Sequence, residues 1–498
     1  MKRYLIWILL ITFMTAIAEN PKREFRGAWL HVIGQTQWQN KTQDQQRKYI
    51  EEQLGLLQES GCNAVIFQVR PTADALYISD LEPWSAWLTG KRGKAPSPLW
   101  DPMEYAIEEA HKRGMEFHAW LNPYRVTSST KDVLPADHAV NTEPHRFVKF
   151  SGQIFFDPAY QENRDFICEV VKDIVSRYDV DGIHIDDYFY PYPKDGKKFD
   201  GDGESYAKFG EGMEKNAWRR HNVDLLIEQL NKTIKDTKDW VRFGVSPFGI
   251  WRNKGNDPRG SNSNGLQNYD DLYADVLLWA EKGWIDYLAP QLYWSLDLAV
   301  APSRHLAEWW NENANGVDVY IGQDVNRTMN TEDPKNNDKN ELDTKVRLSR
   351  ELPNVKGNIW WHGYWVTENL NGVLDSLAMK YQSTLALPPA YGDQALKPRK
   401  VNNLKLVKNN NQVFLTWEKP QTSGDALATD AVKYVVYQFF PDEEIDINDA
   451  ETIISITPFN KVLVEDISAG PTAEGSTFIV TSVDRMNRES EPVKVMWR

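Results

Sequence analysis

Cysteine is scarce in this chain, and Cys62 and Cys168 are the only two among 498 residues. Two cysteines cannot form a disulfide framework in a protein of this size, and no Cys/His spacing typical of a zinc site occurs. Both lie in apolar stretches beside predicted helices, so we expect two buried free thiols. No motif implies a bound group, so neither a metal nor an organic cofactor is predicted.

Positive charge is also in deficit, and the formal net charge is -14 at pH 7. Non-specific binding to nucleic acid or to an anionic membrane relies on basic patches, so we expect neither as a partner. Aromatic residues, in contrast, are plentiful, with 20 Trp, 21 Tyr and 19 Phe. Such numbers are typical both of many buried rings and of a cleft that stacks on sugars, so composition leaves both interpretations open.

Long apolar runs are missing except at the N-terminus, where Tyr4 to Met14 is apolar. This run is shorter than the ~20 residues that a membrane-spanning helix needs. Lys2 and Arg3 precede it, and Ala16-Ile17-Ala18 follows with the small-x-small pattern of a cleavage site. We therefore predict a signal peptide over residues 1–18 and export to the periplasm or outside the cell. No stable membrane insertion is expected after cleavage.

Strand-like and helix-like patterns alternate eight times after the signal peptide, which predicts an α/β protein with a (β/α)8 TIM barrel over residues 22–385. The predicted strands are 26–32, 64–69, 116–121, 182–186, 242–246, 287–292, 317–322 and 357–361. The predicted helices are 43–60, 102–113, 162–178, 217–236, 270–282, 301–313, 343–351 and 372–382. The loops that follow strands are mostly long and those that precede them are short, which places the catalytic face at the strand ends.

The helical pattern ends in a proline-rich stretch that we interpret as a linker, residues 386–400. Residues 401–498 then contain short alternating strands at 412–417, 433–439 and 477–483, separated by turn residues. About a hundred residues of this kind predict a small all-β sandwich. A Trp and a Tyr in successive strands resemble the core of a fibronectin type III module.

The most informative segment is DGIHIDDYFYPYP, residues 181–193. It alternates like a buried strand, so that His184 and Asp186 share one face. The strand ends in two adjacent carboxylates, Asp186 and Asp187, which aromatic residues follow. Carboxylates beside rings that stack on sugars are what cleavage of a glycosidic bond needs. The segment therefore points to chemistry on carbohydrate.

Polar and aromatic side chains also gather at the ends of other predicted strands. The candidate substrate-binding residues are Gln68, Arg70 and Asp74 after strand two; His118, Trp120, Asn122, Tyr124 and Arg125 in and after strand three; His184 and Tyr188 around strand four; and Gln291, Tyr293 and Trp294 after strand six. Any one of them also fits a satisfied polar group in a packed barrel core. Four clusters at corresponding strand ends indicate a shared cleft.

For several of these residues the sequence leaves two interpretations open, one functional and one structural. Arg70 and Arg125 would hold a substrate carboxylate or hydroxyls, or simply pair with nearby aspartates. Trp251 and Trp294 would be stacking platforms or core residues.

Asp186 is the leading catalytic candidate, because it is in phase with His184 and lies at the barrel mouth. The alternative for Asp186 is a structural carboxylate that caps the next segment. Asp187 faces the other side unless the strand has ended in a turn, and it is a candidate acid, a group that raises its neighbour's pKa, or a loop ion-pair partner.

The sequence resembles the glycosyl hydrolase-like 10 family of bacterial cell-envelope proteins. The motifs that carry the resemblance are FRGAWL (25–30), QVRPTADALY (68–77), PWSAWLTGKRGK (83–94), EEAHKRGMEFHAWLNPYRV (108–126), DGIHIDDYFYPYP (181–193), FGVSPFGIWRN (243–253), NGLQNYDDLYADV (264–276) and DYLAPQLYW (286–294). The resemblance implies a TIM-barrel glycoside hydrolase, similar to an enzyme that cleaves peptide-stripped peptidoglycan strands. It places Asp186 and Asp187 in the family's acidic motif. The same strand is also distantly similar to that of family 18 chitinases, but Tyr188 stands where their catalytic glutamate would be.

These observations predict an exported glycoside hydrolase that acts on an N-acetylhexosamine-containing envelope polymer, with peptidoglycan glycan as the expected substrate. In this hypothesis Asp186 is the nucleophile or electrostatic stabiliser, and Asp187 is the acid or modulates the pKa of its neighbour. Two alternatives stay open, a hydrolase of a dietary or host polysaccharide and a barrel that binds glycan without cleaving it.

Overall fold

The computed structural model describes residues 20–39, 41–129, 131–136, 138–422, 427–466 and 474–497. The predicted signal peptide, residues 1–18, lies outside this range. No helix within the described part of the chain is long and apolar enough to cross a membrane. Cys62 and Cys168 are buried free thiols, as predicted.

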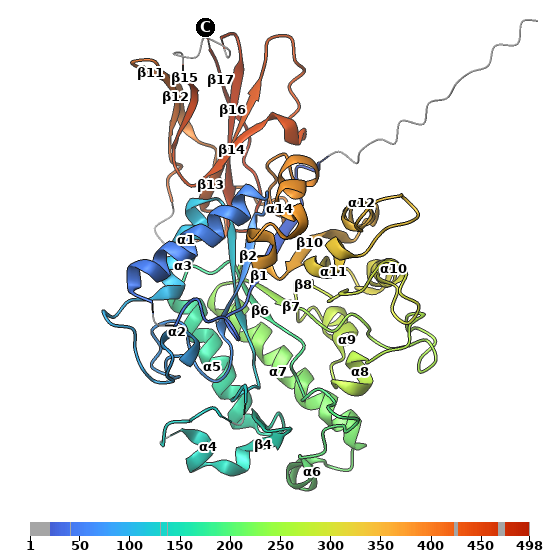
Figure 1. Ribbon diagram of the computed structural model, residues 1–498. Helices are drawn as coiled ribbons and strands as arrows, with labels where there is room; N and C mark the ends of the chain where they lie inside the picture. The colour runs from blue at the N-terminus through green and yellow to red at the C-terminus, as the bar shows by residue number, and fades with distance from the viewer. Residues whose placement is uncertain are drawn as a thin grey trace, which may run out of the picture.

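Eight parallel strands close into a barrel in the order β1-β10-β9-β8-β7-β6-β3-β2 (Figure 1). They are β1 (Phe25–Leu30), β2 (Ala64–Arg70), β3 (Glu116–Leu121), β6 (Gly182–Ile185), β7 (Arg242–Val245), β8 (Tyr287–Leu288), β9 (Asp318–Asp324) and β10 (Val355–Trp361). The prediction of a (β/α)8 barrel is therefore confirmed. β8 is much shorter than predicted, because Pro290 has no N–H to donate and the pairing continues only as single bridges at Gln291.

The main helices cover the outside of the barrel. They are α1 (Gln43–Glu59), α3 (Pro102–Lys112), α5 (Gln161–Arg177), α7 (Lys215–Thr237), α10 (Ser303–Asn313) and α12 (Leu342–Glu351). Their starts follow the expected chemistry: the Asp101 side chain accepts hydrogen bonds from the N–H groups of Met103 and Glu104, with Pro102 in the first turn.

Two predicted helices are interrupted. The stretch 270–282 forms α8 (Asn268–Asp271) and α9 (Val276–Glu281), because Tyr273 between them has φ +56°, outside the helical range. Near 372–382 the chain forms only α14 (Val373–Ser376) between the short turns η2 (Leu370–Gly372) and η3 (Leu377–Tyr381), since Asn371 and Gly372 are left-handed.

The long loops contain elements that the sequence did not indicate. They are α2 (Ala86–Thr89), α4 (Ala139–Thr142), η1 (Pro144–Arg146), β4 (Phe147–Phe150), β5 (Gln153–Phe156), α6 (Gly203–Phe209), α11 (Val325–Asn330) and α13 (Gly363–Thr367). All are short, and periodicity has little predictive power over three to seven residues.

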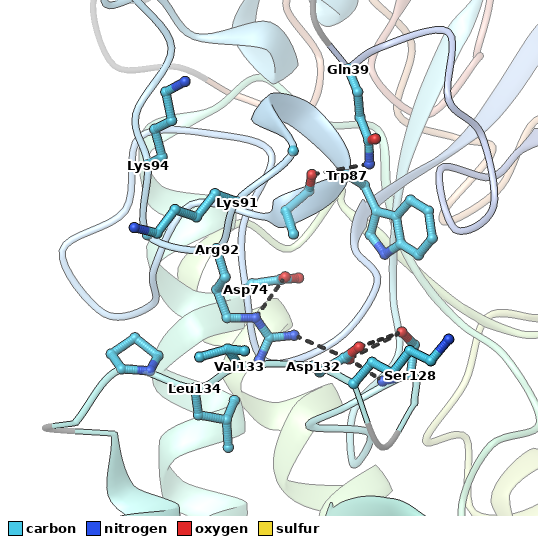
Figure 2. Close-up of a pocket in the computed structure, with 15 residues that line it drawn as sticks. Gln39, Asp74, Trp87, Lys91, Arg92, Lys94, Ser128, Asp132, Val133 and Leu134 are labelled. Carbon is cyan, nitrogen blue, oxygen red and sulfur yellow. Dashed lines mark hydrogen bonds and ion pairs between the residues drawn. The ribbon is translucent and has the colours of Figure 1, made fainter.

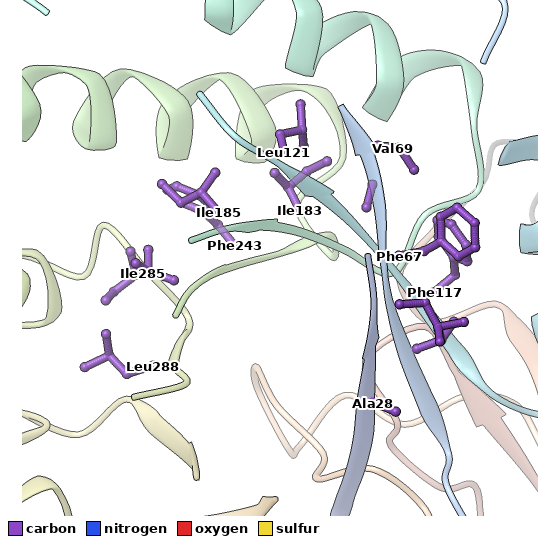
Figure 3. Close-up of a cluster of buried hydrophobic side chains, with 14 of the residues drawn as sticks. Ala28, Phe67, Val69, Phe117, Leu121, Ile183, Ile185, Phe243, Ile285 and Leu288 are labelled. Atoms are coloured by element: carbon purple, nitrogen blue, oxygen red, sulfur yellow. The ribbon is translucent and has the colours of Figure 1, made fainter. Parts of the chain in front are cut away.

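Side chains of the barrel strands alternate between two cores. Ile183 and Ile185 of β6 point outward and lie near Leu121 and Phe243, in a core cluster that also includes Phe67 (Figure 3). The lumen holds a separate cluster of Phe25, Trp29, Ala64, Ile66, Trp120, Tyr287, Ala289, Tyr320 and Ile359. The predicted alternation of β6 is therefore confirmed, and it directs His184 and Asp186 toward the barrel axis.

Gly244 in β7 is required by the lumen packing. A Cβ at this position would overlap the ring of Tyr287, which is fully buried. We expect Gly244→Ala to lower the free energy of unfolding by about 3 kcal/mol, because overpacking must displace this ring. Chemical denaturation measures the change. Gly55→Ala in α1 is the control, since its Cβ would meet open space and should not destabilise. Equal stability of both variants would contradict the packing argument.

The described residues of the C-terminal part form seven antiparallel strands in two sheets. The first sheet has the order β11 (Asn402–Asn409), β12 (Gln412–Glu418) and β15 (Lys461–Asp466). The second has the order β14 (Ile453–Thr457), β13 (Ala431–Phe439), β16 (Thr477–Asp484) and β17 (Val493–Met496). The turn η4 (Ala450–Thr452) precedes β14. Leu415 and Trp417 from the first sheet pack with Tyr434, Val436 and Phe478 from the second. The prediction of an all-β C-terminal part is confirmed.

This β module contacts the barrel at the end where the strands begin (Figure 1). Asn487 donates to the Glu116 carboxylate at the start of β3 over 2.6 Å, and Arg485 pairs with Asp179 before β6. Leu387, in the predicted linker, exchanges backbone hydrogen bonds with Lys22 and Glu24. The module therefore lies opposite the strand ends that carry the candidate site.

Candidate active site

A cleft of about 430 Å³ opens at the C-terminal ends of the barrel strands, and we call it the mouth cleft. It is lined by Trp29, His31, Ile33, Gln68, Trp120, Arg125, Asp186, Asp187, Tyr188, Tyr192, Ser246, Phe248, Gln291, Tyr293 and Trp361. Residues from seven of the eight strands or the loops behind them contribute to it. The structure thus brings together residues that are up to 332 positions apart in the sequence.

Asp186 follows the last residue of β6, and its side chain is 5% exposed. The Trp120 indole N–H donates to its carboxylate over 3.2 Å, and the Asn122 amide donates to the same oxygen. Burial raises the pKa of Asp186, while the charge of Arg125 and these donors oppose the shift. The donors orient the carboxylate and favour its ionised form.

A polar network fixes the groups that hold Asp186. The Asn122 carbonyl oxygen accepts hydrogen bonds from Gln68 over 2.9 Å and from Arg125 over 2.6 Å, which leaves its amide N–H to point at Asp186. Gln68 in turn accepts from the backbone N–H of Val32 over 2.9 Å. Each partner has one possible orientation, so the network sets the position of the carboxylate before any ligand binds.

Asp187 also lines the mouth cleft, because β6 ends at Ile185 and the chain turns at this point. The sequence alone left the direction of Asp187 open, because Asp187 faces the cleft only if the strand has already ended in a turn. The Tyr192 hydroxyl donates to the Asp187 carboxylate. Burial, together with the negative charge of Asp186, raises the pKa of Asp187 to about 7. The adjacent pair can therefore hold one proton near neutral pH, and Asp187 holds it because the charge of Arg125 favours ionised Asp186.

A buried layer of polar residues lies below the carboxylates. His184 contacts the Tyr287 hydroxyl at 2.9 Å and the Ser246 hydroxyl at 2.9 Å, and the Trp29 indole N–H donates to it over 3.2 Å. Burial and the nearby His118 hold the pKa of His184 well below its usual value. The imidazole is thus neutral and acts as a support beneath the site.

Aromatic rings form the walls of the mouth cleft. Tyr293 and Trp361 stack with centroids 6.1 Å apart, and Trp29 meets Trp361 edge-on. On the other side the Arg125 guanidinium lies 4.6 Å from the centre of the Tyr188 ring. Flat apolar faces beside hydrogen-bonding carboxylates and amides match the two kinds of surface that a sugar ring presents.

The comparisons with known proteins now bear on this geometry. The sequence profile of the family "Glycosyl hydrolase-like 10" matches residues 24–341. The glycosyl hydrolase YngK of Bacillus subtilis (strain 168) is 36% identical over 512 aligned positions, which cover 99% of this chain and 98% of that protein. This chain belongs to the glycosyl hydrolase-like 10 family. It is a glycoside hydrolase.

A shorter relative of this glycosyl hydrolase-like 10 protein shares the barrel region. The glycosyl hydrolase DigH of Escherichia coli (strain K12) is 39% identical over 331 positions, covering 62% of this chain and 74% of DigH. Among solved structures, the glycoside hydrolase domain of PgaB (BpsB) from Bordetella bronchiseptica is 11% identical, with a TM-score of 0.47, and covers 72% of this chain and 99% of that one.

Several residues predicted to bind substrate lie outside the mouth cleft of this family member. Arg70 is fully buried and forms a two-pronged ion pair with Glu82, in which the closest N–O distance is 2.6 Å. Of its two interpretations, pairing with a nearby carboxylate is therefore the one observed, although the partner is a glutamate and not one of the aspartates. Asp74 pairs with Arg92 at 3.3 Å in a neighbouring pocket. His118 contacts Glu116 at 3.0 Å deep in the lumen.

The aromatic assignments outside the cleft also need correction. Tyr124 is 0% exposed and belongs to the core outside the barrel. Trp251 is 2% exposed and stacks on Trp309 with centroids 6.0 Å apart, so it offers no face to a ligand. Trp294 packs edge-on against Phe248, which lines the cleft, and supports the wall from behind. Asn122 and His184 support the site through Asp186 and Ser246 without lining the cleft.

The structure adds residues that the sequence analysis did not select. They are Trp29, His31, Ile33, Tyr192, Ser246, Phe248 and Trp361. The sequence contains a signal for Trp29, because alternation from Phe25 places its side chain on the lumen face of β1. Trp361 likewise ends β10. Tyr192 and Phe248 sit in loops, where no periodicity indicates direction. In the described part of the chain, no cluster of His, Cys, Asp and Glu is arranged to hold a metal ion.

Proposed function

We propose that this protein hydrolyses an N-acetylhexosamine-containing glycan of the bacterial envelope, with peptidoglycan glycan strands as the substrate. The observation that carries the proposal is the pair Asp186 and Asp187 side by side in an aromatic cleft, where the charge of Arg125 lowers the pKa of Asp186 while the charge of Asp186 raises the pKa of Asp187. Two carboxylates with different affinities for a proton are the usual equipment for glycosidic cleavage. The resemblance to a family of cell-envelope enzymes supports the choice of polymer.

The two carboxylates take different roles in this proposal. Asp186, oriented by Trp120 and Asn122, acts as the nucleophile or stabilises positive charge at the anomeric carbon in the transition state. Asp187 donates its proton to the leaving oxygen as the bond breaks. Arg125, Gln291 and Tyr293 orient the sugar, and the rings of Trp29 and Trp361 line its subsites.

The hydrogen bond from Tyr192 gives a test of the acid's identity. The bond favours ionised Asp187 and therefore lowers its pKa. In Tyr192→Phe this pKa should rise, so the proton is retained to higher pH. We expect the alkaline limb of kcat to move up by about half to one pH unit. A pH profile of kcat measures the shift. An unmoved limb, or one moved to lower pH, would show that Asp187 is not the titrating acid.

The proposal includes export and a role for the β module. The pattern of residues 1–18 supports export to the periplasm or outside the cell. The seven strands, with Trp417 and Tyr434 in contact at 5.2 Å between ring centres, support a fibronectin type III-like module. Because it contacts the barrel end opposite the mouth cleft, the module would serve as a spacer or docking unit.

A substrate panel tests the proposal. The mature protein is incubated with peptide-stripped peptidoglycan glycan, intact peptidoglycan and plant polysaccharides, and new reducing ends are counted. We expect release from the stripped glycan at a rate well above that from any plant polymer. Release only from a plant polysaccharide would identify that polymer, in place of the envelope glycan, as the substrate.

A further inference from the structure

A second and larger pocket lies on the same end of the barrel, with a volume of about 730 Å³. We call it the side pocket, and the residues that line it include Gln39, Trp87, Lys91, Lys94, Ser128 and Lys131 (Figure 2). These residues come from the loops that follow β1, β2 and β3. The mechanism proposed above uses none of them.

The side pocket is basic on a protein that is strongly acidic overall. Lys91, Arg92, Lys94 and Lys131 line it against only two carboxylates, Asp74 and Asp132. Both carboxylates are engaged by Arg92, at 3.3 and 3.9 Å. The three lysines have no ion pair among the described residues, and Lys91, Lys94 and Lys131 are exposed. Their charge is therefore available to a ligand.

The loop that carries Lys91 and Lys94 is held in one conformation. The Thr89 hydroxyl contacts the backbone oxygens of both lysines, at 3.1 and 2.9 Å, and the N–H of Gly93 donates to Trp84 over 2.8 Å. Arg92 anchors the loop to the barrel through the Val126 carbonyl at 3.1 Å and the Thr72 hydroxyl at 2.8 Å. A preorganised loop loses less entropy when it binds a ligand.

An aromatic ring completes the side pocket. Trp87 is half-buried and lies across from the basic loop (Figure 2). An indole ring and ammonium groups that line one pocket suit a ligand with both a flat apolar face and a negative charge. A sugar that carries a free carboxylate has both.

The side pocket is adjacent to the mouth cleft along the chain. Arg125 lines the mouth cleft, and Ser128, three residues later, lines the side pocket. The Pro71 carbonyl accepts from Arg125, and Thr72 and Asp74 follow directly behind it. The mouth cleft and the side pocket are therefore lined by neighbouring parts of one loop, residues 125–128.

We propose that the side pocket is a subsite for a carboxylate-bearing sugar of the glycan held in the mouth cleft, with Lys91 and Lys94 binding the carboxylate and Trp87 stacking on the ring. The inference rests on the proposed function. In peptidoglycan the lactyl carboxylate is free only where the stem peptide has been removed, since the peptide is attached through it as an amide. The subsite therefore selects stripped strands. The same chemistry would recognise a uronic acid in another polysaccharide.

The test compares Lys91→Gln/Lys94→Gln with a matched control, Lys405→Gln/Lys408→Gln, which removes the same charge from exposed lysines of the β module. The substrates are stripped glycan with free carboxylates and the same glycan amidated with methylamine. We expect the wild type and the control to prefer the free carboxylates by about tenfold in kcat/KM, mainly through KM, and the test variant to lose that preference. About 0.5 M salt should abolish the preference in the wild type as well. An equal preference in all three proteins would overturn the inference.

A binding measurement separates this inference from the proposed function. The full chain with Asp186→Asn, with and without the two lysine substitutions, is titrated calorimetrically with stripped glycan, amidated glycan and oligogalacturonate. Lysine-dependent binding of stripped glycan supports the subsite as stated. Lysine-dependent binding of oligogalacturonate alone supports the subsite and places its carboxylate on a uronic acid, against the proposed function. Binding that is independent of the lysines, or no binding of any carboxylated glycan, overturns the subsite.

Discussion

Asp186→Asn is expected to lower kcat on stripped peptidoglycan glycan by about 10³- to 10⁴-fold with little change in KM. The substitution keeps the shape of the side chain and its contacts with Trp120 and Asn122 but removes the negative charge. That charge is what a developing positive centre in the transition state requires. Steady-state counting of new reducing ends measures the loss.

The matched control for this result is Asp297→Asn. Asp297 follows β8 on the same end of the barrel, is half-exposed and pairs with Lys335 at 2.8 Å outside the mouth cleft. It should retain activity within about twofold of the wild type, because an exposed pair of this kind contributes little. Both variants should show the unchanged circular dichroism spectrum of the folded barrel. A fully active Asp186→Asn protein would remove this residue from the mechanism.

Asp187→Asn is expected to lower kcat by about 10²- to 10³-fold and to change the pH dependence of what remains. The pKa of Asp187 is raised to about 7, so the carboxyl is protonated below that pH and loses its proton above it. An acid catalyst acts in its protonated form. Wild-type kcat should therefore fall as the pH rises through about 7, and the variant should lack this alkaline limb.

The leaving group distinguishes a lost acid from a disturbed site. A 4-nitrophenyl glycoside of the same oligosaccharide departs without protonation, so Asp187→Asn should lose much less activity on it than on the natural polymer. Asp186→Asn should be impaired on both, since stabilising the anomeric centre is needed in either case. Equal losses of Asp187→Asn on both substrates would assign Asp187 a role in orienting Asp186.

The barrel and the main acidic motif follow from local patterns in the sequence. Alternation in β6 predicts that Ile183 faces the helices and His184 the lumen, and Asp101-Pro102 predicts the start of α3. Both depend on neighbours within a few residues. The position of Asp187 in the cleft depends on the turn after Ile185, which the alternation alone left undecided.

The remaining site depends on which side chains pair with each other, which one sequence does not reveal. Arg70 has the same chemistry as Arg125, yet Glu82 captures it in the core, while Arg125 reaches Asn122 and the cleft. Trp251 follows a strand end as Trp361 terminates another, yet Trp309 covers its face. Which ring is open to a ligand is decided by such packing partners, and Trp309 is 58 positions from Trp251 in the sequence. Polar or aromatic residues at a strand end therefore predict where a site lies better than they predict which residues line it.

Hydrolysis in water enriched in ¹⁸O tests the central claim most directly. The mature protein is incubated with stripped peptidoglycan glycan in H₂¹⁸O, and the products are analysed by mass spectrometry with Asp186→Asn as the control. We expect short saccharides that carry one ¹⁸O at each new reducing end, from the wild type alone. Unlabelled products with an anhydro terminus, labelled products from both proteins, or no products beside saturable binding would contradict hydrolysis at Asp186 and Asp187.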